Sequence, residues 1–340
     1  MSASMLLGLV IAVVVVALVF DFINGFHDTA NAIATVVSTG VLPLRTAIYL
    51  AALLNFVGAF TGTAVASTIG KGIITPSTIT LVVIFSALVG AIFWNLFTWY
   101  FGIPSSSSHA MVGGLIGAGF AHSGLSSIQG PGLTKIVTTL VVSPLVGMLV
   151  AFIFMILLFW IFRRAAPAGT SSLFRRLQML SAGFMALSHG SNDAQKTMGV
   201  ITMSLVAAGY MVLPEAGKIA VPMWVVVASA TAMGLGTAAG GVRIIKTLGT
   251  KIIDLKPMHG FAAETAAATV IFTASHYGLP VSTTHCISGS ILGVGASQSV
   301  SAVRWGITTR ILWAWVLTIP ISAFCAFLMY WPASWLTGNP

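Results

Sequence analysis

Two acidic residues stand in similar short motifs, one in each half of the chain. Asp28 lies in NGFHDTAN at 24–31, and Asp193 lies in SHGSNDAQK at 188–196. Both motifs follow or interrupt apolar segments, where an ionisable group is costly and usually functional. A carboxylate beside amide and carbonyl oxygens forms a site for a hard cation. We therefore predict that Asp28 and Asp193 hold the coupling cation, and are its metal ligands if it is Na⁺, with further oxygen ligands from Asn24, Asn31 and Asn192.

The glycines of these motifs, Gly25 and Gly190, predict that the helix unwinds or bends beside each carboxylate and frees backbone carbonyls. The plainer alternative is an aspartate that caps a helix at the membrane interface. Asp21, which precedes the first motif, is expected at that interface.

Other polar residues near these motifs each have two interpretations. His27 either titrates and couples protons, or it hydrogen-bonds a neighbouring helix. Lys196 either neutralises Asp193 or contacts an anion. Glu264 lies in an apolar segment without a basic residue at helical spacing, so it either lines the pathway as a coupling-ion residue or caps a helix start. Asn55 either joins two helices by a hydrogen bond or takes part in function.

Clusters of hydroxyl residues form the second kind of motif. Each follows a Gly-x-Pro break, in FGIPSSSSH at 101–109 and in YGLPVSTTH at 277–285. A Ser or Thr there can cap the following helix, whose free N–H groups and partial positive charge attract an anion. His109 and His285 either donate to that anion or hold the turn in place. Two capped turns without a ligand are the alternative to the predicted substrate-binding set of Ser105, Ser106, Ser107, Ser108, Ser282, Thr283 and Thr284.

The motifs repeat in register about 165–176 residues apart, which indicates two related halves. The second pair extends through glycines at 113, 117 and 119 and at 289, 293 and 295, which are expected to pack helices closely. We predict an all-α integral membrane protein of two inverted-topology repeats, with broken helices, two re-entrant helical hairpins and roughly 10–12 membrane segments. The first repeat is 1–162, a basic cytoplasmic linker is 163–176, and the second repeat is 177–340.

Composition supports a membrane location and excludes several classes of protein. Of the 340 residues, 57% are hydrophobic and only 6% are charged, too few to cover the surface of a soluble domain. The net charge of +9 arises mostly from short loops, which fits membrane topology and gives no basic stripe for nucleic acid. The two cysteines form neither a disulfide framework nor a zinc site, and no cofactor is expected.

The motifs at 24–32, 190–196 and 278–286 resemble the signatures of the inorganic phosphate transporter (PiT) family, and the likeness covers both halves. The resemblance implies secondary uptake of inorganic phosphate with protons or sodium, an inverted-repeat fold, and a homodimer in the lipid bilayer of a prokaryotic inner (plasma) membrane. It places phosphate at the two hydroxyl clusters and assigns the family's aspartate pair to Asp28 and Asp193 and its second-half glutamate to Glu264. The form Gly-Phe-His-Asp is similar to the bacterial low-affinity, proton-coupled type, which carries phosphate with a divalent metal.

Three alternatives stay open at the level of sequence. Some bacterial relatives carry sulfate, so another tetrahedral oxyanion is a possible substrate. An anion channel would also need repeats and a polar pore. An intramembrane serine hydrolase would use a Ser–His pair, but one such site suffices for a hydrolase and the arrangement here is duplicated.

Overall fold

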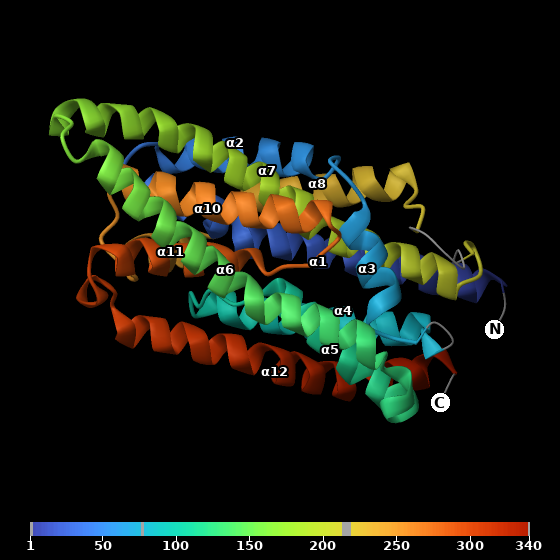
Figure 1. The fold of residues 1–340 in the computed structure, drawn as a ribbon. Helices are drawn as coiled ribbons and strands as arrows, with labels where there is room; N and C mark the ends of the chain where they lie inside the picture. Colours follow the sequence, from blue (N-terminus) through green and yellow to red (C-terminus); the bar gives the residue numbers. More distant parts are fainter. Residues whose placement is uncertain (1–2, 76–77, 213–218, 339–340) are drawn as a thin grey trace.

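The computed structural model describes residues 3–75, 78–212 and 219–338, and within them it consists of helices without a β-strand (Figure 1). In chain order the α-helices are α1 (Ala3–Ser38), α2 (Leu44–Gly58), α3 (Ala64–Gly72), α4 (Leu81–Tyr100), α5 (Ser107–Ser123), α6 (Gly130–Phe162), α7 (Pro167–Ala207), α8 (Met223–Ala239), α9 (Val242–Thr250), α10 (Pro257–His276), α11 (Thr283–Gln298) and α12 (Trp305–Thr337). Most of them run side by side along one direction of the molecule.

Two apolar cores fill the interior, and a polar layer separates them. The first contains the start of α1 and the end of α7, with Phe20 and Met198 among its members. The second contains the end of α1 and the start of α7, with Ile33 and Met185 among its members. Between these segments, both helices carry their polar motifs at full burial. The functional motifs therefore lie in the middle of α1 and α7.

Two helical hairpins reach this layer, as predicted. Residues 101–106 join α4 to α5, and residues 277–282 join α10 to α11. Each turn contains a glycine with positive φ, +65° at Gly102 and +67° at Gly278, a conformation that other residues rarely adopt. Hydroxyl groups from two short helices hold these glycines. Thr247 of α9 donates to the carbonyl of Gly102 at 2.8 Å, and Thr68 of α3 donates to that of Gly278 at 2.6 Å.

Each hairpin packs along the last helix of the other half, α5 against α12 and α11 against α6. Glycines permit this close approach: a side chain at Gly113 would collide with Ile319, and one at Gly289 would collide with Pro144. These contacts confirm the expected packing role of the glycine series and interlock the two halves. The inversion of one half relative to the other stays a prediction.

Four described helices are long and apolar enough to cross a membrane, namely α1, α4, α6 and α12. The pair α8 and α9, bent by 72°, makes a fifth candidate as one broken span. Hydropathy does not select α7 and α10, although both are long, because they bury many polar side chains. The sequence-based number of 10–12 segments also included such polar and shorter pieces.

The expectation that helices unwind beside the two aspartates was wrong. Helices α1 and α7 continue without interruption through Asp28 and Asp193. The motif glycines serve close packing instead, because a Cβ at Gly25 would meet the carbonyl of Met233 and a Cβ at Gly190 would meet that of Asn55. The polar stretch at 163–176 is also mostly helical, since α7 begins at Pro167.

Candidate functional site

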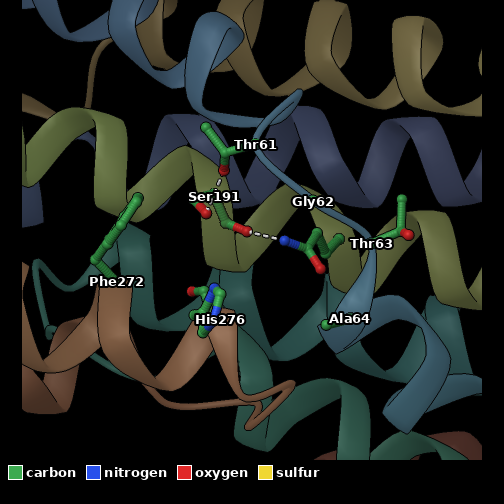
Figure 2. A pocket seen from close by; sticks show the side chains of 9 residues that line it. Thr61, Gly62, Thr63, Ala64, Ser191, Phe272 and His276 are labelled. Atoms are coloured by element: carbon green, nitrogen blue, oxygen red, sulfur yellow. Dashed lines mark hydrogen bonds between the residues drawn. The ribbon is translucent and has the colours of Figure 1, made fainter.

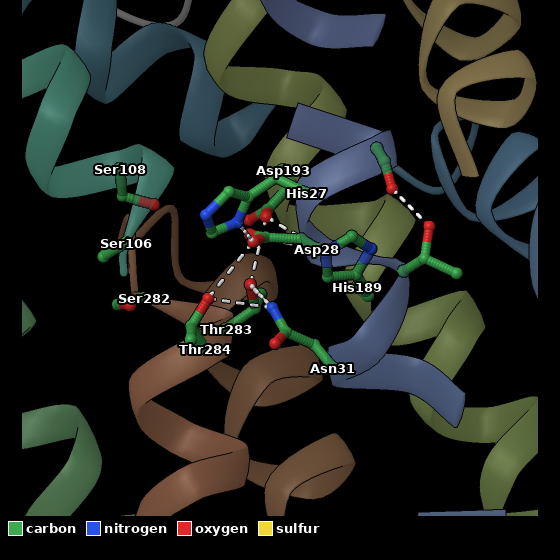
Figure 3. A network of polar contacts seen from close by, with 12 residues as sticks. His27, Asp28, Asn31, Ser106, Ser108, His189, Asp193, Ser282, Thr283 and Thr284 are labelled. Atoms are coloured by element: carbon green, nitrogen blue, oxygen red, sulfur yellow. Dashed lines mark hydrogen bonds and ion pairs between the residues drawn. The ribbon is translucent and has the colours of Figure 1, made fainter. Parts of the chain in front are cut away.

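The two aspartates, which lie far apart in sequence, meet at the centre of the molecule around His189 (Figure 3). His189 Nε2 lies 3.2 Å from Oδ2 of Asp193 and 4.0 Å from Oδ2 of Asp28. All three side chains are buried, and each offers a ligand atom within 4.8 Å of the others. Two carboxylates and an imidazole form a donor set that can hold a cation.

Asn55 of α2 fixes the orientation of this imidazole. Its Oδ1 lies 3.0 Å from His189 Nδ1, while its Nδ2 donates to the hydroxyl of Thr237 at 2.9 Å. The amide oxygen thus accepts from Nδ1, and Nε2 faces the carboxylates. A ligand histidine is commonly oriented by such an outer hydrogen bond. Asn55 thus joins helices by hydrogen bonds, as one interpretation expected, and its part in function stays a prediction.

Sequence reasoning missed His189 as a site residue. A signal was present, because His189 stands four residues before Asp193 and therefore on the same face of α7. Its contact with Asp28, however, depends on how α1 packs against α7, and one sequence does not show that arrangement.

His27 connects Asp28 to the first hairpin. Its Nδ1 lies 2.6 Å from Asp28 Oδ1, and its Nε2 lies 3.2 Å from the hydroxyl of Thr98 and 3.4 Å from that of Ser105. The ring thus hydrogen-bonds a neighbouring helix, as one interpretation expected. It also places an imidazole between a carboxylate and a hydroxyl of the predicted anion site.

The hydroxyl clusters cap their helices as predicted. Ser106 accepts from the backbone N–H of His109 at 3.1 Å, and Ser282 accepts from that of His285 at 3.2 Å. Ser107, at the first position of α5, is buried, and its hydroxyl has no hydrogen-bond partner in the described chain. That hydroxyl is free to bind a ligand.

The second hairpin touches both aspartates directly. Thr283 donates to Asp193 Oδ2 at 3.0 Å, and Thr284 donates to Asp28 Oδ1 at 3.4 Å (Figure 3). Asn31 Nδ2 also donates to Thr284, at 2.9 Å. The predicted anion and cation sites are therefore neighbours in one hydrogen-bonded network.

The predicted asparagine ligands keep an oxygen free. Asn192 donates through Nδ2 to Ser275 at 2.8 Å, and Asn31 donates as described above. The Oδ1 atoms of Asn24, Asn31 and Asn192 are buried and accept no hydrogen bond from any residue that the structure describes. Of the three, Asn24 lies one helical turn before Asp28, beside Asp21.

Lys196 forms the salt bridge expected with Asp193. Its Nζ also contacts the hydroxyl of Ser108 at 2.5 Å and the carbonyl of Val281 at 2.9 Å. The ammonium group therefore lies between the tips of the two hairpins.

Glu264 belongs to a separate cluster. It accepts hydrogen bonds from Thr35 at 2.5 Å, from Gln178 at 3.1 Å and from Ser181. Thr35 lies seven residues after Asp28 on α1, about 10 Å further along the helix. The helix-cap interpretation of Glu264 was wrong, because α10 begins at Pro257. Its assignment as a coupling-ion residue stays a prediction.

Asp21 was expected at the membrane interface, but its side chain is fully buried within the protein. Neither carboxylate oxygen has a hydrogen-bond partner within residues 3–75, 78–212 and 219–338, although Thr197 and Asn24 are close by.

The two hairpin histidines pack against each other. The ring centroids of His109 and His285 lie 4.4 Å apart, and His285 stacks on Trp315 at 3.8 Å. His109 Nδ1 lies 2.7 Å from Ser106 Oγ. Because that serine caps α5, this Ser–His contact supports the structural interpretation of the histidines.

A polar cavity of about 160 Å³ lies against α7 beside the site (Figure 2). Thr61, Ser191, Gln195, Ser275 and His276 contribute polar groups to its wall. Ser275 also accepts from Asn192, the residue preceding Asp193. The cavity therefore borders the polar layer.

Comparisons with known protein families, sequences and structures agree with one another over most of the chain. The model described as "Phosphate transporter family" matches residues 24–326. A protein of Rhizobium meliloti named "Probable low-affinity inorganic phosphate transporter" is 49% identical, over 98% of this chain and 99% of its own length. A Bacillus subtilis protein of the same name is 50% identical, over 96% and 98%. A solved structure described as "The sodium-dependent phosphate transporter" superposes with a TM-score of 0.89 at 25% identity, covering 97% of this chain and 100% of the other.

Proposed function

This chain belongs to the phosphate transporter family, and on that premise we propose that it imports inorganic phosphate across a prokaryotic plasma membrane together with protons or sodium. The observation that carries the proposal is the direct hydrogen bonding of Thr283 to Asp193 and of Thr284 to Asp28. It brings a predicted anion site and a predicted cation site into contact. The protein is a transporter and not an enzyme.

Phosphate would bind at the hairpin tips. The starts of α5 and α11 supply helix N-termini, and Ser107 supplies a free hydroxyl. Hydrogen bonds to an anion are roughly twice as strong as those between neutral groups. Neutral donors also suit a transporter, because the substrate must leave as well as bind.

The coupling cation would bind at Asp28 and Asp193, with amide oxygens from Asn31 and Asn192. A cation there offsets the repulsion between phosphate and the carboxylates, which is large in a medium of low dielectric constant. Phosphate and cation would thus favour each other's binding. A divalent metal that enters with phosphate would fit the same Asp28–His189–Asp193 group.

His27 supports protons as one coupling ion. It lies between the carboxylate of Asp28 and the hydroxyl of Ser105, so it can move a proton between the two sites. Sodium is supported by the likeness to a solved transporter that is described as sodium-dependent. The two coupling ions are distinguished by whether an imposed sodium gradient or an imposed pH gradient drives phosphate uptake.

Alternating access would arise from movement of the hairpins relative to α1 and α7. We assign one opening of the transport path to the polar cavity beside Ser191, because this cavity borders Asn192 in the central polar layer. Simultaneous binding of anion and cation would hold the second hairpin tip on the two aspartates, where it lies in this structure, and close that path. A homodimer, implied by the family resemblance, completes the proposal.

The test is uptake of labelled phosphate by purified protein in proteoliposomes under imposed sodium or pH gradients. We expect saturable uptake that an inward gradient of the coupling cation accelerates, and that excess unlabelled phosphate blocks more strongly than sulfate. Preferential inhibition by sulfate would assign the other oxyanion. An anion conductance without saturable uptake would indicate a channel.

A further inference from the structure

The ammonium group of Lys196 occupies a site built from oxygen atoms. Its three contacts are the carboxylate of Asp193, the hydroxyl of Ser108 and the backbone carbonyl of Val281. Lys196 is 2% exposed, so no solvent shell replaces these partners. An ammonium group has three N–H donors, and each has an acceptor here.

These three acceptors come from three different parts of the fold. Asp193 lies on α7, Ser108 lies in the first turn of α5, and Val281 lies just before α11. Carboxylate, hydroxyl and carbonyl oxygens are also the ligands that a small hard cation takes. The lysine therefore fills, with a charge fixed to α7, a site of the kind that could hold a free cation between the hairpin tips.

The position of Lys196 changes how many free cations the polar layer needs. The carboxylates of Asp28 and Asp193 lie close together, and the ammonium group of Lys196 is bonded to Asp193. Lys196 therefore supplies one of the positive charges that these buried carboxylates need. Without the lysine charge, one more free cation would be needed, because an uncompensated charge at this depth is costly.

We propose that Lys196 is a tethered cation that takes the place of one mobile coupling cation and so sets the number of ions bound with each phosphate. This inference rests on the proposed function for its meaning in transport, but the cation site itself is testable without transport. It also accounts for the bridging of Ser108 and Val281, which a salt bridge to Asp193 alone would not require.

A consequence concerns the hydroxyl of Ser108. It accepts from Lys196 and donates to the carbonyl of Val281 at 3.2 Å, so both its functions are occupied. Ser107, whose hydroxyl has no partner among the residues described, is then the better phosphate ligand on the first hairpin. Lys196 thus gives the two serines different roles. Ser108 joins the two hairpin tips, and Ser107 stays available to bind substrate.

The experiment compares sodium binding to purified wild-type protein and to Lys196→Gln, using labelled sodium and thermal melting in sodium chloride or choline chloride. We expect Lys196→Gln to bind one more sodium ion per chain than wild type, and sodium to raise its melting temperature more than that of wild type. Lys196→Arg keeps the charge and should bind no additional sodium. Lys135→Gln, an exposed change, serves as the matched control.

Each outcome decides the proposal. A folded Lys196→Gln protein that binds no more sodium than wild type would overturn it. Failure of this variant to fold in choline but not in sodium supports it, whereas failure in both salts would contradict it, because sodium should replace the ammonium. If wild type carries no phosphate while Lys196→Gln still gains a sodium ion, the proposed function fails and the tethered cation stands.

Discussion

Thr283 donates its hydroxyl to Oδ2 of Asp193 across 3.0 Å, and the same carboxylate oxygen lies 3.2 Å from His189 Nε2. One carboxylate thus contacts the tip of the second hairpin and the imidazole that approaches the other aspartate. If this carboxylate binds the coupling cation, as proposed, the tip of the second hairpin is in direct contact with the cation site.

Removing the free hydroxyl of the first hairpin tests the anion site. We expect Ser107→Ala to raise the KM for phosphate by about 10-fold or more, because a hydrogen bond to a charged ligand is worth roughly 1.5–3 kcal/mol. Ser126→Ala is the control, since Ser126 is exposed and its hydroxyl donates to the nearby carbonyl of Ser123. Equal KM values for both variants would place phosphate elsewhere.

The support of His189 by Asn55 predicts coupled mutations. We expect Asn55→Ala to lower uptake roughly 10- to 100-fold, as loss of a group that orients a ligand typically does, and His189→Gln, which removes the imidazole itself, to lower it at least as much. Because both act through the same imidazole, the double variant should be little worse than His189→Gln alone. Uptake measured for the four proteins completes the cycle. Full additivity of the two effects would show that Asn55 acts independently of His189.

The second hairpin turn depends on positive φ at Gly278. In Gly278→Ala the new Cβ would also approach the carbonyl of Ala64 to 2.9 Å, so we expect both lower stability and weaker phosphate uptake. Gly209→Ala is a matched control, because its φ is +78° but nothing lies within 4 Å of the added Cβ. It should lose about 1–2 kcal/mol of stability from the positive φ alone and keep the KM for phosphate. A normal KM in Gly278→Ala would separate the turn from the site.

Two buried carboxylates predict opposite effects of the same chemical change. Glu264→Gln removes an acceptor shared by three donors and should destabilise the fold by about 1–3 kcal/mol. Asp21→Asn replaces a carboxylate whose oxygens have no partner in the described chain, and should leave the melting temperature unchanged or raise it. Melting of both variants at one pH measures the difference. A larger loss of stability in Asp21→Asn than in Glu264→Gln would contradict these assignments.

The sequence predicted what repeats and composition encode, and it missed what depends on packing. Turn glycines, helix-capping serines and closely packed glycines were readable because each follows a local rule. Gly25 and Gly190 were misread as points of unwinding, since only the positions of α8 and α2 reveal that they allow backbones to meet. Burial of Asp21 was likewise invisible, because charge alone suggested an interface.

The site was predicted in parts rather than as a whole. Asp28, Asp193 and the two hydroxyl clusters were found from duplicated motifs, and the structure brings them into one network. The central position of His189 was not found, because its partner Asp28 is distant in sequence. Glu264 was grouped with the aspartates by family resemblance, and the structure places it in a cluster of its own.

The central claim, that two aspartates bind the coupling cation beside a phosphate held by the hairpin tips, is tested most directly by phosphate uptake in Asp28→Asn and Asp193→Asn. Asp254→Asn is the control, because Asp254 is 91% exposed and pairs with Arg304 at the surface. We predict that both central variants lose uptake driven by a cation gradient while remaining folded, and that Asp254→Asn transports as wild type does. Unchanged gradient-driven uptake in the two central variants would contradict the account.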